Sequence, residues 1–235
     1  MPRIRAVLFD LGGTLVDERN FAGWVEIARH CLLDLDPESL AHAFVEVERE
    51  FDAEQPVADR TTREVRFWQE TLGRAIGRPV PLEQAKRFLS VVRSTDDQPY
   101  PLFSDARRCL ERLRAEHRQL GVVSNSTSEA RVRAILDRAG IVDFFDRVVS
   151  SGTEGVAKPD PAIFRRAVDR LGVPPAEAFY IGNLPNVDAR AARAAGLHSV
   201  WLNREGTGLG SDPPEITSLL EVPLCVRLLE TGAAL

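Results

Sequence analysis

Asp10 is the first residue whose position points to chemistry. It follows the apolar run Val7–Phe9, and a Gly12-Gly13-Thr14 sequence begins two residues after it. The apolar run predicts a buried parallel strand, and the glycines predict a tight turn. Open α/β sheets bind ligands beyond the carboxyl ends of such strands. We therefore expect Asp10 to lie at a ligand site, where a carboxylate can act as a nucleophile.

Polar residues follow further apolar runs. Ser124 and Asn125 follow one predicted strand, Asn183 and Asp188 follow another, and Lys158 lies between these pairs in the sequence. A hydroxyl, an amide and backbone N–H groups can hold an oxyanion. A lysine can neutralise charge on a nucleophile and on a transferring group. Carboxylate and amide oxygens can bind Mg²⁺.

Taken singly, each of these residues has an ordinary structural explanation. An aspartate can stabilise a turn, a Ser-Asn pair can begin a helix, and most lysines are solvated. Asp188 can favour the dipole at a helix start. Their shared position after successive predicted strands is more specific than any one of them.

The elements that position these residues alternate between strand and helix from Ser104 onward. Predicted strands cover residues 4–9, 121–124, 147–150, 178–181 and 199–202. Predicted helices cover 104–116 and 126–138 and begin again at Asp160-Pro161 and at Asn186. Ser126 and Glu129 are expected to form a capping box, and Asp160 to cap a helix with proline at its first position. This order predicts an α/β fold: a Rossmann-like, doubly wound, mostly parallel sheet with helices on both faces.

Residues 20–94 show helical periodicity and no convincing strand. The predicted helices there are 20–33, 37–52, 61–76 and 82–93. We therefore expect an α/β core built from residues 1–16 and 97–235, with an all-helical cap domain, residues 17–96, inserted after the first strand. Trp24 and Trp68 fit apolar helical stripes, so we expect them to pack the cap.

Composition restricts the class of protein. The chain is 44% hydrophobic and 28% charged, which is ordinary for a soluble globular protein. A net charge of −5 gives no broad basic surface for nucleic acid. The three cysteines lie far apart, as in a reducing compartment, and there is no signal-peptide pattern or membrane-spanning apolar stretch. We expect a cytoplasmic protein that acts on a small molecule.

The order of these motifs resembles the haloacid-dehalogenase-like (HAD-like) hydrolase superfamily, in the subgroup with a helical cap after the first motif. The resemblance spans about residues 4–222, and the run from Lys158 to Phe164 (Lys-Pro-Asp-Pro-Ala-Ile-Phe) is especially characteristic. It implies that Asp10 forms a covalent intermediate, that Ser124 binds the transferred group, and that Lys158 orders the site. The implied catalytic set is Asp10, Thr14, Ser124, Asn125 and Lys158.

The same resemblance implies a Mg²⁺ site and a cap that closes over the substrate. The implied metal set is Asp10, the carbonyl of Gly12, Asn183 and Asp188. Two of these positions depart from the pattern of the family's phosphatases. Gly12 stands where an aspartate protonates the leaving group and then activates water, and Asn183 stands where a second aspartate binds the metal. Losing a general acid/base costs about 10²–10⁴ in rate, and an uncharged ligand leaves Mg²⁺ weakly bound.

Three interpretations therefore remain open. The first is a hydrolase of small phosphorylated metabolites that works through an aspartyl-phosphate, with its activity weakened or restored by another residue such as Asp17, Glu18 or His30. The second is a metal-independent 2-haloacid dehalogenase-type hydrolase. The third is a non-catalytic or regulatory binding module that kept the fold.

Each alternative meets an objection in the sequence. Displacement of halide needs neither a leaving-group acid nor Mg²⁺, and Asn183 suits an asparagine that dehalogenases keep. Dehalogenases, however, usually carry an aromatic residue at the position of Gly12. The spacing of residues in their fourth motif also differs from the spacing between Asn183 and Asp188 here. A pure scaffold has no need to keep Asp10 together with Lys158.

Overall fold

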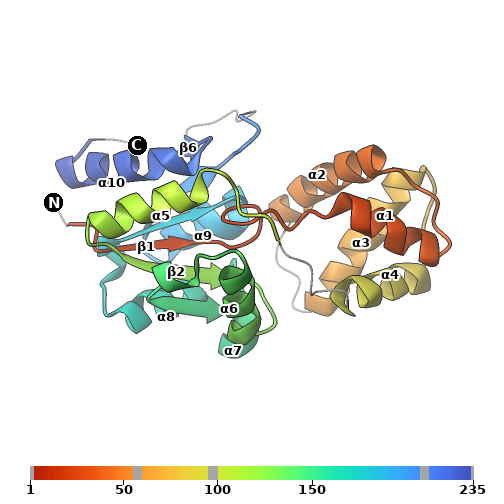
Figure 1. Cartoon of the computed structure of the whole chain (residues 1–235), viewed down its shortest axis with the longest axis horizontal. Helices are drawn as coiled ribbons and strands as arrows, with labels where there is room; N and C mark the ends of the chain where they lie inside the picture. Colours follow the sequence, from red (N-terminus) through yellow and green to blue (C-terminus); the bar gives the residue numbers. More distant parts are fainter. Residues whose placement is uncertain (1–2, 55–59, 95–99, 207–211, 234–235) are drawn as a thin grey trace. The chain divides into compact units, whose positions relative to one another are not determined.

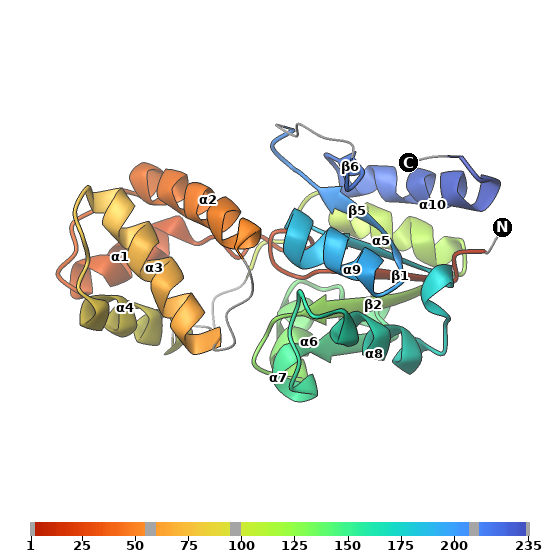
Figure 2. The same ribbon diagram turned by 180° about the vertical axis from the view of Figure 1, so that it is seen from behind.

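The structure is a computed structural model that describes residues 3–54, 60–94, 100–206 and 212–233. Its contacts divide the chain into two compact units, one made of Met1–Glu18 with Pro99–Leu235 and the other of Arg19–Gln98. Figures 1 and 2 show both units from opposite sides. We call them the core unit and the helical unit and describe each separately.

The described part of the core unit contains one six-stranded parallel sheet, ordered β3-β2-β1-β4-β5-β6 (Figure 1). The strands are β1 (Ala6–Phe9), β2 (Gln119–Ser124), β3 (Arg147–Ser150), β4 (Ala178–Gly182), β5 (His198–Leu202) and β6 (Glu215–Ile216). The helices are α5 (Ala106–Ala115), α6 (Glu129–Arg138), α7 (Ser151–Glu154), α8 (Pro161–Leu171), α9 (Ala191–Ala194) and α10 (Val222–Thr231). Shorter helical turns cover Val142–Phe144, Pro175–Glu177, Pro185–Arg190 and Leu219–Glu221.

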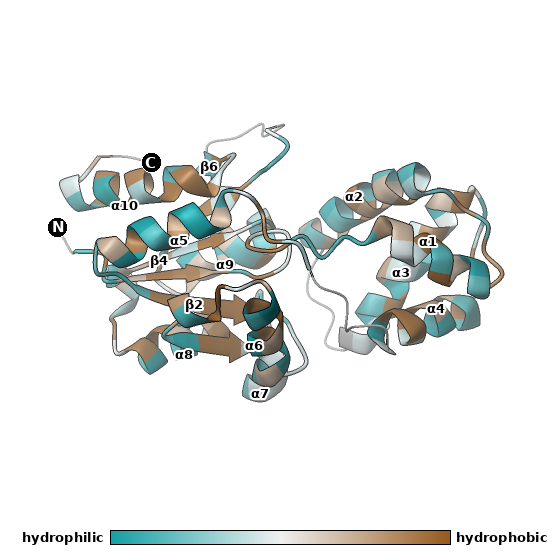
Figure 3. Cartoon of the chain, in the orientation of Figure 1, coloured by the Kyte–Doolittle hydropathy of each residue, from teal (hydrophilic) through white to brown (hydrophobic). Residues whose placement is uncertain are grey.

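Apolar side chains bury both faces of this sheet. In β1, Val7 and Phe9 belong to a cluster with α5, α6 and α10, whereas Ala6 and Leu8 belong to a cluster with α8 and α9. Successive side chains of a strand point to opposite faces, so a strand covered on both sides must be apolar throughout. Figure 3 shows mostly hydrophobic strands between helices that carry both hydrophilic and hydrophobic residues. The predicted doubly wound fold is confirmed.

The helical unit contains α1 (Phe21–His30), α2 (Pro37–Ala53), α3 (Arg60–Ile76) and α4 (Leu82–Ser94), close to the predicted ranges. Asp36 caps α2 by accepting hydrogen bonds from the backbone of Glu38 and Ser39. Trp24 and Trp68 are buried, with ring centroids 4.8 Å apart, so their predicted packing role is confirmed. None of the described helices is long and apolar enough to span a membrane.

Some predicted element boundaries were wrong. The helix expected from Ser126 begins at Glu129, and Ser128 is its N-cap, because the Ser126 carbonyl accepts hydrogen bonds from Gly152 and Ser151 instead. The helix expected from Asn186 opens as a π-helical turn, Pro185–Arg190. The sequence did not predict β6 and α10, which follow a loop whose residues 207–211 lie outside the described chain.

Candidate active site

Parallel pairing brings the predicted site residues to one edge of the sheet. In the register, Phe9 of β1 lies beside Val122 of β2 and Ile181 of β4. The residues that follow these partners therefore meet beyond the same strand ends. Asp10 is fixed there by its N–H, which donates to the Ile181 carbonyl at 2.9 Å.

Lys158 joins the first and last motifs. Its Nζ lies 2.6 Å from Asp10 Oδ1 and 2.6 Å from Asp188 Oδ1. Lys158 is 4% exposed and Asp188 only 1%. Buried charges need such partners, because an unpaired one costs several kcal/mol. Residues up to 178 positions apart in the sequence therefore form one buried ion-pair cluster.

Burial and charge set the protonation of this cluster. Burial raises the pKa of Asp10 to about 7; Lys158 opposes this rise, and the negative charges of Asp188 and Glu18 add to it. Burial alone would lower the pKa of Lys158, but the two carboxylates raise it overall. Lys158 therefore stays protonated near neutral pH, and Asp10 becomes a carboxylate as the pH rises through about 7.

Two further residues support Lys158. Tyr180 is the first: its ring is fully buried, and its hydroxyl accepts from Lys158 Nζ at 3.1 Å and donates to Asp188 Oδ1 at 2.9 Å. A buried tyrosine hydroxyl needs a partner, and this was the sequence signal for its role. Asn125 holds the Lys158 backbone from both sides, by N–H···Oδ1 at 2.8 Å and Nδ2–H···O at 2.9 Å.

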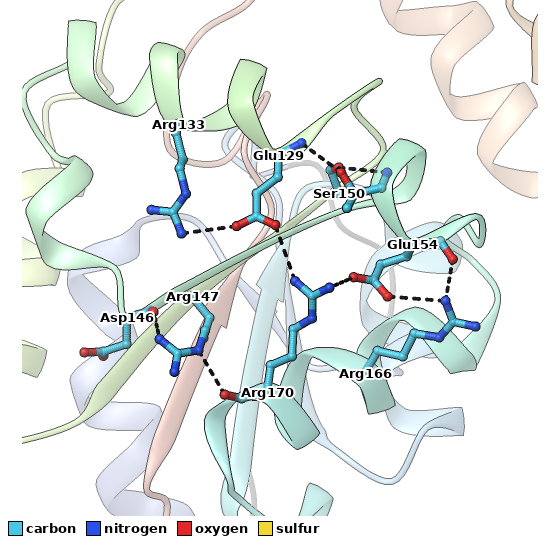
Figure 4. Close-up of polar contacts among 9 residues, drawn as sticks. Glu129, Arg133, Asp146, Arg147, Ser150, Glu154, Arg166 and Arg170 are labelled. Atoms are coloured by element: carbon cyan, nitrogen blue, oxygen red, sulfur yellow. Dashed lines mark hydrogen bonds and ion pairs between the residues drawn. The ribbon is translucent and has the colours of Figure 1, made fainter.

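A polar network joins α6, α7 and α8 (Figure 4). Arg166 and Arg170 of α8 both pair with Glu154, which ends α7. Arg170 also reaches Glu129 of α6 at 3.4 Å, and Arg147 of β3 donates to the Arg170 carbonyl at 3.0 Å. Exposed ion pairs add little stability individually. Together they fasten the helices that precede and follow the lysine segment.

Two hydroxyl groups complete the predicted set. Ser124 ends β2 and is 8% exposed. Thr14 is fully buried, and its Oγ1 has no hydrogen-bond partner among the described residues. A buried hydroxyl without a partner is costly, so Thr14 is suited to bind an atom of a ligand.

Arg204 braces this turn and was missed by the sequence analysis. It donates to the Thr14 carbonyl at 2.7 Å, pairs with Asp105 at 2.9 Å, and lies 3.8 Å from the ring centroid of Phe103. It follows β5 and contacts a turn 190 positions earlier in the chain. Neither residue type nor spacing predicts such a contact.

Asn183 lies against the glycine turn. With its nitrogen toward them, its amide donates to Asp10 Oδ2 and to the Gly12 carbonyl, both at 3.2 Å. The opposite orientation would bring three oxygens together, so we assign the donating one. Gly13 has φ 71°, and a Cβ there would lie 2.5 Å from the nearest atom of the Asn183 amide group. Glycine is therefore required at position 13 for this close approach.

A family model described as haloacid dehalogenase-like hydrolase matches residues 4–196. The chain belongs to this family. It is 34% identical over 157 residues to a phosphoserine phosphatase of Thermus thermophilus, an alignment that covers 67% of this chain and 60% of that protein. It is 33% identical to a glyceraldehyde 3-phosphate phosphatase of Methanopyrus kandleri, over 86% of this chain and 84% of that protein.

The fold of this HAD-like hydrolase is shared with solved structures. One is described as a predicted phosphoglycolate phosphatase from Haemophilus somnus; the TM-score is 0.73 at 20% identity, with 96% of this chain and 99% of that chain covered. At that identity the likeness concerns the fold alone.

The residues implied for Mg²⁺ bring oxygen atoms close together beside the glycine turn. Asp10 Oδ2 and the Gly12 carbonyl both lie 3.2 Å from the Asn183 amide, which donates to them in one orientation and in the other would place its own oxygen beside theirs, where a cation could bind all three. Asp188 uses Oδ1 for Lys158 and Tyr180 and Oδ2 for the Leu184 N–H. Within the described ranges, no group of three or more His, Cys, Asp or Glu residues could hold a metal ion.

Proposed function

We propose that this HAD-like hydrolase cleaves small phosphate monoesters with Asp10 as covalent nucleophile. The observation that carries the proposal is the Lys158 ammonium held 2.6 Å from the Asp10 carboxylate at the end of a buried strand. Relatives at 33% and 34% identity are phosphatases of small phosphorylated compounds, which supports the substrate class.

The reaction has two steps. A carboxylate oxygen of Asp10 attacks phosphorus, forming an aspartyl-phosphate and releasing the leaving-group oxygen, which takes up a proton. Water then attacks phosphorus, regenerating the carboxylate and releasing inorganic phosphate. Lys158 compensates charge near the nucleophile in both steps, and the Thr14 and Ser124 hydroxyls donate to phosphoryl oxygens.

The test is release of inorganic phosphate from p-nitrophenyl phosphate by the full chain. We expect turnover by the native protein and none by Asp10→Asn, with Lys86→Met unchanged. Lys86 is the only other lysine in the chain and lies in the helical unit, at 49% side-chain exposure. No phosphate release under any condition would contradict the proposal.

A second candidate is hydrolysis of a 2-haloacid. The observation that favours it is the Asn183 amide, which can donate to Asp10 Oδ2 and to the Gly12 carbonyl. The two reactions place the label differently when they are run in H₂¹⁸O. Attack of water on phosphorus places the label in phosphate, whereas attack on the acyl carbon of an ester intermediate places it in the Asp10 carboxylate. If neither reaction occurs and phosphate or vanadate only raises the melting temperature, the protein is a binding module.

A further inference from the structure

After β1 the chain turns back on itself, so that Val16 lies beside Gly12. Gly12 forms a bridge with Val16, and the Gly13 N–H donates to the Val16 carbonyl at 2.9 Å. The exit of the turn is held by the core, because Val16 bridges Leu102 and the Asp17 N–H donates to Pro101 at 2.8 Å. The next residue is Glu18, which still belongs to the core unit.

The Glu18 carboxyl group fills the space that Gly12 leaves open. A Cβ built on Gly12 would overlap the carboxyl carbon and both carboxyl oxygens of Glu18. A carboxyl group therefore lies where a side chain at position 12 would begin, although position 12 has none. Its negative charge also acts on Asp10, whose pKa it helps to raise.

The carboxyl groups of Asp10 and Glu18 differ in solvent exposure. Asp10 is 8% exposed, as suits a nucleophile shielded from water, whereas Glu18 is exposed. An exposed carboxyl group beside the nucleophile can give a proton to a departing oxygen and take one from an incoming water molecule. Both carboxyl groups are carried by the same short stretch of the core unit, so their proximity does not depend on the helical unit.

We propose that Glu18 is the general acid/base of this site and replaces the aspartate that the family's phosphatases carry at position 12. The inference rests on the proposed phosphatase function. In the first step the Glu18 carboxylic acid gives its proton to the leaving-group oxygen as the P–O bond breaks. In the second, the resulting carboxylate takes a proton from the water that attacks the aspartyl-phosphate. Glu18 thus ends the cycle protonated, as it began.

The experiment compares Glu18→Gln and Asp17→Asn with the native chain, on an alkyl phosphate and on p-nitrophenyl phosphate. Glutamine keeps the size of the side chain but cannot exchange a proton. We expect Glu18→Gln to lose about 10²–10⁴-fold in kcat on the alkyl phosphate. The burst of p-nitrophenol should persist, because this leaving group needs little protonation, while the aspartyl-phosphate accumulates.

Two further variants keep the test independent of folding. Glu177→Gln is the control for loss of a surface carboxylate. Glu177 lies in the turn before β4, at the end of this strand that is far from the site. In Gly12→Asp/Glu18→Ala the overlap between the two side chains is removed, and we expect most of the lost activity to return. Gly12→Asp alone must displace Glu18 and should gain less.

The outcomes separate this inference from the proposed function. If the native chain releases no phosphate, the proposed function fails and the inference fails with it. A second outcome would overturn the inference alone. In that outcome the native chain is active and Glu18→Gln keeps full activity on the alkyl phosphate, whereas Asp17→Asn loses it. Equal losses on both substrates, without accumulated aspartyl-phosphate, would also overturn it.

Discussion

Removing the Lys158 ammonium should destabilise the core unit strongly. In Lys158→Met, an unbranched apolar side chain of similar length replaces the cation between Asp10 and Asp188. Both carboxylates stay buried, at 8% and 1% exposure, and lose contacts of 2.6 Å. Breaking a buried ion pair by removing one partner costs about 3–5 kcal/mol.

This cost converts into a large thermal shift. In a protein of this size about 1 kcal/mol moves the melting temperature by roughly 2–4 °C, so we expect a fall of about 6–20 °C. Scanning calorimetry at pH 7.5 measures it. Lys86→Met is the matched control, because Lys86 pairs with Glu83 where both side chains are about half exposed or more. We expect its effect to stay within about 0.5 kcal/mol.

Charge, rather than packing, should account for the loss. Without the ammonium, which lowers the pKa of Asp10, this buried carboxylate takes up a proton more readily, so the destabilisation should shrink as the pH falls from 7.5 to 5. It should also shrink in an Asp188→Asn background, where only one carboxylate is left uncompensated. A Lys158→Met protein as stable as the native chain at pH 7.5, or a loss that does not depend on pH, would refute the reasoning.

Three other predictions concern the same site. The value of kcat/KM for p-nitrophenyl phosphate, whose leaving group needs little protonation, should rise with pH through about 7, because Asp10 attacks only as a carboxylate and burial raises its pKa. Asp188→Asn removes a charge that raises this pKa and should move the rise to lower pH, and an unmoved pH–rate profile would contradict this. Mg²⁺ should raise the melting temperature of Asn183→Asp, which sets a second carboxylate beside Asp10, more than that of the native chain. Equal responses by calorimetry would show that the uncharged amide binds the cation as well as a carboxylate does. Arg204→Met should lower the free energy of urea unfolding by about 1–3 kcal/mol and also lower kcat, because the guanidinium holds the Thr14 carbonyl; a loss of stability with unchanged kcat would limit it to a structural role.

Local sequence signals predicted most of the fold. The two-sided burial of β1 is visible in its uninterrupted apolar run, and the cap Asp160 could be predicted because it precedes a proline. The prediction of a helix start at Ser126 was wrong, because the Ser126 carbonyl accepts a hydrogen bond from α7 and α6 begins later. That contact joins segments distant in sequence, and no local pattern encodes it.

The candidate site was predictable in its residue types and not in its contacts. Asp10, Lys158 and Asp188 could be placed at one sheet edge from the order of strands alone. The orientation of the Asn183 amide depends on which atoms lie beside it. The return of Glu18 over Gly12 depends on the exact turn between them. Gly12 appeared in the sequence as a missing group, and the structure shows the space occupied by another part of the chain.

The most direct test of the account asks whether Asp10 becomes phosphorylated. The native chain is mixed with p-nitrophenyl phosphate, quenched within one turnover and reduced with borohydride, which converts an aspartyl-phosphate into an alcohol side chain. Peptide mass spectrometry then identifies the residue at position 10. We expect reduced Asp10 in the native chain, more of it in Glu18→Gln, and none in Asp10→Asn. Phosphate release with an unmodified Asp10, or full turnover by Asp10→Asn, would contradict it.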